Sequence, residues 1–203
     1  MCIRDRIFRE RGHTILLLDL RGHGGSEGRH TTLGCRERAD VLAAVAELRG
    51  RRLASAGVVL EGHSMGAVAV LLAAPETQDL RGVIVEAPYD SYRRSIAHHV
   101  RLVYGLPEWL PLIPMTIAVA EWRAGFDADD ADAVAAASRF SAPLLAIADG
   151  DDRRMSEAVV RRVFDAHHGP GRLWVAAGVG HVGAILHPDY VQQVRSFLDE
   201  HGL

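Results

Sequence analysis

The sequence contains no lysine, and all 23 of its basic residues are arginines. A Walker-type phosphate loop needs a lysine, and so do a pyridoxal Schiff base and a lysine-dependent aldolase. Composition alone therefore excludes these three kinds of site.

Cysteine is also scarce. Only Cys2 and Cys35 occur, and they form neither a metal-ligand spacing nor a disulfide framework. The histidines do not have the spacing of a metal site either. We therefore expect no metal and no other cofactor, and the cysteine usage fits a reducing, cytoplasmic location.

The chain lacks a strong charge bias and long apolar runs. Its net charge is −3, with acids and bases mixed along the sequence, so neither nucleic acid nor an anionic membrane is an expected partner. The most apolar longer stretch, residues 109–120, is broken by Pro111 and Pro114 and is too short to span a bilayer. No signal-peptide pattern opens the sequence.

The 203 residues are 48% hydrophobic, which suffices for one substantial core, so we expect a single domain over 1–203. Strand-like apolar runs alternate with helical patterns along it. The patterns predict strands at 13–20, 56–60, 81–87, 142–148 and 172–177, and helices at 7–11, 35–48, 67–74, 156–166 and 188–200. This alternation predicts an α/β fold with a mostly parallel sheet and helices on both faces. The run at 13–20 is continuously apolar, as in a strand buried on both faces.

Residues 92–137 interrupt the alternation. Three prolines, Pro107, Pro111 and Pro114, punctuate helical pieces there, and Trp109 lies between them. An apolar, proline-broken insertion at this point predicts a small helical lid over a site rather than a separate domain. Ordinary helical packing is the alternative.

One short stretch, Gly62-His63-Ser64-Met65-Gly66, lies between a strand-like run and a helix-like run. A Gly-x-Ser-x-Gly in that context is the nucleophile-elbow pattern, in which a strained turn projects the serine hydroxyl from the end of a sheet. The flanking glycines would let strand and helix backbones approach closely. The alternative is a serine in a glycine-rich turn without chemistry.

A second glycine-rich loop, Arg21–Gly28, follows the first apolar run. Its glycines are spaced G-x-G-x-x-x-G, one residue off the dinucleotide-binding fingerprint, and no matching acidic residue follows a next strand. Nucleotide binding is therefore not expected.

Three chemically complementary side chains are expected at the carboxyl ends of the strands, where parallel sheets bind ligands. They are Ser64, an aspartate in the loop 149–152, and His181. A serine hydroxyl is a weak nucleophile and needs an imidazole to take its proton. The imidazole in turn needs a carboxylate to hold its tautomer.

Together the elbow, the stretch Leu20–Gly28, residues 143–152 and Gly178–His181 resemble the α/β-hydrolase superfamily. The likeness is greatest to its esterase and serine-aminopeptidase-like branch and covers nearly the whole chain from Ile7. It implies that Ser64 is the nucleophile, His181 the general base, and the Met65 backbone N–H the first oxyanion donor.

The identity of the acid is open at this point. The family's acid loop usually reads Gly-x-x-Asp-x-x-Val-Pro; here Asp149 replaces the glycine, and Asp152 best matches the acid. Asp151 is its rival, and Asp90 occupies a place at the end of the preceding strand that some relatives use instead.

The sequence departs from the family at its front. The family's second oxyanion N–H comes from a loop upstream of the Ile15 segment, and a further strand normally lies between that segment and Val58. We therefore expect a gap in the sheet, half an oxyanion hole and a missing natural N-terminus. The first six residues resemble a translated sequencing-adapter remnant of a metagenomic reading frame.

The resemblance implies a serine hydrolase that cleaves a carboxylic ester through an acyl-enzyme, with a small-molecule acyl substrate. The apolar lid favours an apolar acyl group, and His63 and Trp109 are the expected substrate-binding residues. Alternatives are a peptidase, thioesterase or acyltransferase using the same triad, or a non-catalytic or truncation-inactivated protein of this fold.

Overall fold

The computed structural model describes residues 3–107 and 109–203, so the expectation about Cys2 lies outside the described residues. Four strands form one parallel sheet in the order β1-β2-β3-β4. Their bounds are Val58–His63 for β1, Leu80–Glu86 for β2, Leu144–Asp149 for β3 and Gly171–Ala176 for β4. The predicted parallel sheet is confirmed.

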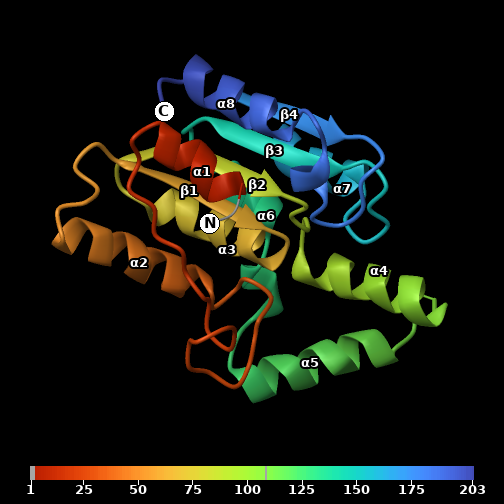
Figure 1. Ribbon diagram of the computed structural model, residues 1–203. Helices are drawn as coiled ribbons and strands as arrows, with labels where there is room; N and C mark the ends of the chain where they lie inside the picture. The colour runs from red at the N-terminus through yellow and green to blue at the C-terminus, as the bar shows by residue number, and fades with distance from the viewer. Residues whose placement is uncertain (1–2, 108) are drawn as a thin grey trace.

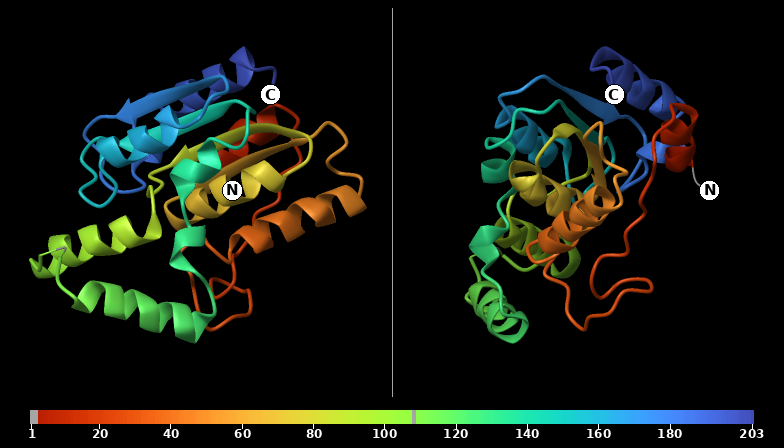
Figure 2. Two further views of the ribbon diagram at one scale, coloured as in Figure 1. Left: turned by 180° about the vertical axis from the view of Figure 1, so that it is seen from behind. Right: turned by 90° about the vertical axis from the view of Figure 1, so that its left-hand side faces the viewer.

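Helices cover both faces of this sheet, as Figures 1 and 2 show. Against one face pack α3 (Met65–Ala73) and α7 (Glu157–Asp165), with α2 (Arg38–Gly50) and α6 (Ala133–Ala137) outside them. Against the other face lie α1 (Ile3–Glu10) and α8 (Tyr190–Glu200), with a short 3₁₀ turn, η3 (Ala184–Leu186). Two further 3₁₀ turns are η1 (Ala74–Glu76) and η2 (Ala128–Asp130).

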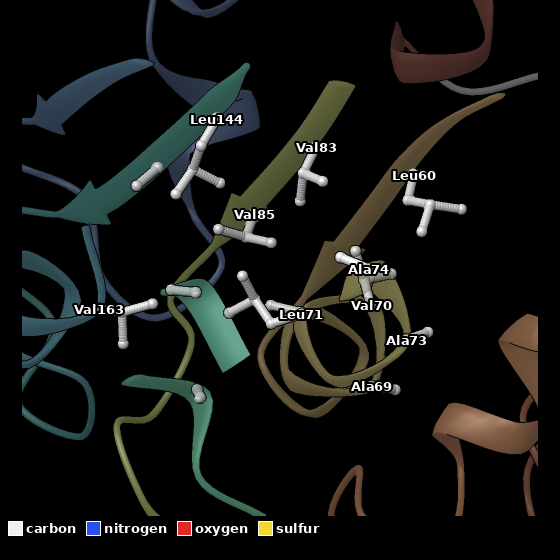
Figure 3. Packing of buried hydrophobic residues seen from close by; sticks show 14 of the residues in the cluster. Leu60, Ala69, Val70, Leu71, Ala73, Ala74, Val83, Val85, Leu144 and Val163 are labelled. Atoms are coloured by element: carbon white, nitrogen blue, oxygen red, sulfur yellow. The ribbon is translucent and has the colours of Figure 1, made fainter. Parts of the chain in front are cut away.

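The burial of the central strands explains why their sequences predict them. Every residue of β3 is buried, whereas β1 alternates between buried and half-buried positions. β3 is flanked by strands on both sides and covered on both faces, so it needs a continuous apolar run. Figure 3 shows Leu60, Val83 and Leu144 on the side of the sheet that faces α3, whose Val70 and Leu71 belong to the same core cluster. Helix α3 is apolar all round because it is buried all round.

The predicted strand at 13–20 is wrong. These residues carry no strand pairing, and the side chain of Leu17 is 73% exposed. A groove of about 870 Å³, lined by residues of this segment and of β1, separates the two. Strand pairing requires backbones ~4.8 Å apart, so an apolar run without a neighbour at that distance stays unpaired. The groove corresponds to the gap that the sequence predicts next to Val58.

The predicted helix at 35–48 begins later than expected, because α2 starts at Arg38. The buried carboxylate of Glu37 accepts hydrogen bonds from the backbone N–H groups of Thr32 and Gly34, at 2.8 and 2.9 Å. These bonds fix a turn that contains Cys35, so the regular helix forms only after it.

Residues 92–137 form two long helices, α4 (Tyr92–Tyr104) and α5 (Leu112–Ala124), followed by η2 and α6. Figure 1 places α4 and α5 beyond the edge of the sheet layers. Ile113 and Ile117 of α5 are buried in a second apolar cluster that includes Val68 of α3. Across the described residues, no helix is long and apolar enough to cross a membrane.

Candidate functional site

Ser64 lies on the sharp turn between β1 and α3. Its backbone has φ 50° and ψ −117°, a conformation that costs free energy for a non-glycine residue. Its N–H donates to the Glu86 carbonyl at 2.8 Å, which ties the turn to the end of the neighbouring strand β2. The strand–turn–helix context expected of an elbow is therefore present around this serine.

Only one of the two flanking glycines is needed for close backbone approach. A Cβ on Gly62 would lie 2.4 Å from the carbonyl oxygen of Gly66, closer than real contacts allow. A Cβ on Gly66 would meet nothing within 4 Å. The steric explanation predicted for both glycines therefore holds for Gly62 and is wrong for Gly66.

The structure brings Ser64, His181 and Asp152 together. Ser64 Oγ lies 2.9 Å from His181 Nε2, and His181 Nδ1 lies 2.7 Å from Asp152 Oδ2. His181 follows β4, and Asp152 lies in the loop after β3, so all three come from the carboxyl ends of strands. A hydrogen-bonded chain in which Nδ1 carries the proton leaves Nε2 free to accept the serine proton.

Asp152 is held in its charged form by its surroundings. Burial would raise its pKa, but hydrogen bonds from His181 and from the backbone N–H groups of Met155 and Arg154 outweigh this, so its pKa lies below the usual value. The two N–H groups donate to Oδ1 at 3.1 and 2.7 Å, while Oδ2 faces the imidazole. An ionised carboxylate is what an imidazolium forming at His181 needs.

The other two acid candidates lie elsewhere. Asp151 is exposed, and its backbone N–H donates to the Val179 carbonyl. Asp90 is buried, but its Oδ2 accepts from Arg94 Nε and Arg162 Nε, each at 2.9 Å. Asp90 therefore binds two guanidinium groups, one from α4 and one from α7, and connects these two helices.

Met65, His63 and Trp109 are the other site residues that the sequence predicts. Met65 is the first residue of α3, so its N–H belongs to the first helical turn, whose N–H groups have no acceptor within the helix. The His63 ring faces two carboxylates, with Nδ1 3.1 Å from Glu86 Oε2 and Nε2 3.6 Å from Glu61 Oε1. Trp109 is 78% exposed. The substrate-binding roles of His63 and Trp109 stay predictions.

A cavity of about 570 Å³ adjoins the histidine. It is lined by Leu102, Asp151, Asp152, Arg153, Arg154 and His181. Leu102 belongs to α4, so residues 92–137 contribute to the wall of the space next to His181.

Two further acidic residues lie at this end of the sheet, and the sequence patterns assigned a role to neither of them. Glu86 ends β2 and Asp149 ends β3, and both are fully buried. Burial and the neighbouring carboxylates of Glu86 and Asp152 raise the pKa of Asp149 to about 7. The sequence feature that could have indicated Glu86 and Asp149 is an acidic residue at the end of an otherwise apolar strand. In the described part of the chain, no group of three or more His, Cys, Asp or Glu side chains could hold a metal ion.

A parallel sheet with helices on both faces, a serine on a strained strand–helix turn, and a histidine and an aspartate on later strand loops is the architecture of an α/β-hydrolase. A family model described as serine aminopeptidase, S33, matches residues 6–121, more than half of the chain. The chain belongs to that family.

Two curated relatives match nearly the whole chain. The chain is 28% identical over 197 residues to the uncharacterised protein YqkD of Bacillus subtilis, covering 95% of this chain and 64% of YqkD. It is 30% identical over 193 residues to the uncharacterised protein Rv2307c of Mycobacterium tuberculosis, covering 93% of this chain and 61% of that protein. The chain thus spans less than two thirds of the length of these relatives.

The solved structures that share the fold include two esterases. Esterase Pf2001 of Pyrococcus furiosus has a TM-score of 0.76 at 22% identity, covering 98% of this chain and 74% of that one. An acetyl xylan esterase from Paenibacillus sp. R4 has a TM-score of 0.67 at 20% identity, covering 90% and 64%. At such identities the likeness concerns the fold alone.

Proposed function

We propose that this protein is a serine hydrolase that cleaves a carboxylic ester with an apolar acyl group through an acyl-enzyme. The observation that carries the proposal is the unbroken chain of contacts from Ser64 Oγ through the His181 ring to Asp152, starting on a strained turn. The family and the esterase fold neighbours support it. The cysteine usage supports a cytoplasmic location.

In this proposal Ser64 Oγ attacks the acyl carbon while His181 Nε2 takes its proton. Asp152 keeps the Nδ1 proton in place and stabilises the imidazolium. The oxyanion of the tetrahedral intermediate accepts from the Met65 N–H at the start of α3, where the helix dipole favours negative charge. His181 then returns the proton to the leaving alcohol, and water hydrolyses the acyl-enzyme by the same steps.

The insertion over 92–137 acts as a lid in this proposal. Leu102 of α4 lines the cavity next to His181, which supports contact between the insertion and the acyl chain. His63, beside the nucleophile, and Trp109, between α4 and α5, are the proposed further substrate contacts.

A peptidase is the second candidate, because the matching family is described as serine aminopeptidase. The two differ only in the bond attacked. Hydrolysis of p-nitrophenyl butyrate compared with aminoacyl p-nitroanilides therefore separates them.

The first test is covalent labelling by a fluorophosphonate probe, comparing the native chain with Ser64→Ala. We expect labelling of the native chain that disappears in the variant, with unchanged thermal midpoints. A folded native chain that does not react would contradict the proposal and favour a non-catalytic protein of this fold.

A further inference from the structure

Two buried carboxylates lie directly beneath the loop that carries His181. Glu86 and Asp149 stand at the carboxyl ends of the adjacent strands β2 and β3, and neither side chain is exposed to solvent. Strand alternation puts Glu86 on the same face as Ile84, and Asp149 on the same face as Ile147. Ile84 and Ile147 belong to the cluster under α8, so both acids point to the side of the sheet where the loop after β4 returns.

Each acid accepts a hydrogen bond from the backbone of that loop. Asp149 Oδ2 accepts from the Val182 N–H at 2.7 Å, and Glu86 Oε1 accepts from the Ala184 N–H at 3.0 Å. Val182 directly follows His181, and Ala184 opens η3. The two hydrogen bonds therefore fix the backbone at the positions one and three residues after His181.

The backbone held by Asp149 is strained. Val182 has φ +58°, in the left-handed region that a β-branched residue rarely enters. Such a conformation persists only where the surroundings enforce it, and it turns the chain sharply just after His181. The Val182 N–H donates the short hydrogen bond to Asp149, so this bond acts directly on the strained residue.

Stability alone does not account for an acid at position 149. Its second oxygen, Oδ1, is buried and has no hydrogen-bond partner among the described residues. A half-satisfied buried carboxyl group is costly for a fold, and an apolar side chain would normally replace it. Groups of this kind concentrate at functional sites.

We propose that Asp149, assisted by Glu86, is a positioning residue that holds His181 at hydrogen-bond distance from both Ser64 and Asp152. The effect of this role on catalysis rests on the proposed function. Asp149 does not touch the reacting atoms; it acts through the Val182 N–H, by fixing the strained turn that sets the direction of the imidazole.

The test compares Asp149→Ala, which removes the acceptor, with Asp149→Asn, whose amide oxygen can still accept from Val182. Glu157→Gln, at an exposed carboxylate paired with Arg161 on α7, is the matched control for loss of an acidic group. For each variant we would measure the exchange rate of the Val182 amide proton and the downfield resonance of the proton between His181 and Asp152. We would also measure the rate of fluorophosphonate labelling, and kcat and KM for p-nitrophenyl acetate.

In Asp149→Ala we expect Val182 amide exchange to accelerate by about 100-fold and the His181 resonance to broaden. We expect the labelling rate and kcat to fall about 100-fold with KM unchanged, since small misplacement of a catalytic group has effects of this size. Asp149→Asn restores all of these values to within about threefold, and neither variant lowers the thermal midpoint.

The proposal is overturned if the Val182 amide and the His181 resonance in Asp149→Ala match those of the native chain. It is also overturned if Ala and Asn variants lose labelling equally together with a lowered thermal midpoint, because the acid would then act on the fold alone. If the native chain is not labelled, the proposed function fails, while exchange and resonance still decide whether Asp149 holds the loop.

Discussion

Ser64 Oγ and His181 Nε2 lie 2.9 Å apart although 117 residues separate them in the chain. The contact joins the turn after β1 to the loop after β4, the two outer strands of the sheet. Every strand between them contributes to it, because Glu86 and Asp149 end the two central strands and bond to the histidine loop.

Asp152→Asn should lower kcat for p-nitrophenyl butyrate by about 10³- to 10⁴-fold, with little change in KM, because an amide favours the wrong histidine tautomer. Asp90→Asn should behave differently. It weakens the attachment of Arg94 and Arg162 and lowers the thermal midpoint, while kcat of the folded protein is retained. Equal losses of kcat in both variants would contradict the assignment of Asp152.

Gly62→Ala and Gly66→Ala form a matched pair on the elbow. The new Cβ at position 62 would lie 2.4 Å from a backbone oxygen, so this variant should be destabilised by roughly 2 kcal/mol or more and lose fluorophosphonate labelling. At position 66 there is space, and alanine favours the helix by up to about 1 kcal/mol. Urea unfolding checks the free energies, and similar values for the two variants would contradict the steric argument.

Asp149 makes the stability of the protein depend on pH. Its folded-state pKa, about 7, lies above the ordinary value of 3.8, so between these values the folded state binds the proton more tightly than the unfolded state. The free energy of unfolding should therefore fall as pH rises from about 4 to 7.

Other charged groups lie near Asp149, among them Glu86 and Asp152, and Glu86 faces Arg4 and His63. The measurement is therefore the difference between the native chain and Asp149→Asn, from urea melts at pH 5 and pH 8. We expect the variant to gain relative stability at the higher pH. A difference that does not change with pH would show that Asp149 does not titrate in this range.

Leu102→Ala tests the contact between the insertion and the substrate. Removing a side chain that lines the cavity should lower kcat/KM for p-nitrophenyl octanoate by roughly 3- to 10-fold, mainly through KM, because apolar burial is lost. p-Nitrophenyl acetate should be affected less. Val103→Ala, at a neighbouring side chain that is 65% exposed, is the control and should change neither.

Sequence patterns predicted the central sheet well and its edge poorly. The runs around Val83 and Leu145 are apolar because they are buried on both faces, and the same pattern at Leu16–Leu18 gave a wrong strand. Apolar content reports a tendency to be buried, whereas strand pairing depends on a neighbour at hydrogen-bonding distance. Across a groove from β1, the segment 13–20 has no such neighbour.

The candidate triad could be placed from chain order, since a serine, an aspartate and a histidine each follow a predicted strand. The family's acid loop favoured Asp152 over Asp151 and Asp90, and only the coordinates show which of these carboxylates contacts His181 Nδ1. The roles of Glu86 and Asp149 could not be predicted, because they accept hydrogen bonds from backbone N–H groups of a distant loop. Every residue type except proline has a backbone N–H, so such a contact leaves no pattern in the sequence.

Glu86 is attached to both halves of the site at once. Its carbonyl oxygen accepts from the Ser64 N–H, and its carboxylate accepts from the Ala184 N–H near His181. A displacement of the end of β2 therefore carries the serine turn and the histidine loop in the same direction. We therefore expect thermal motion of this strand to shift Ser64 and His181 together, with little change in the distance between Ser64 Oγ and His181 Nε2.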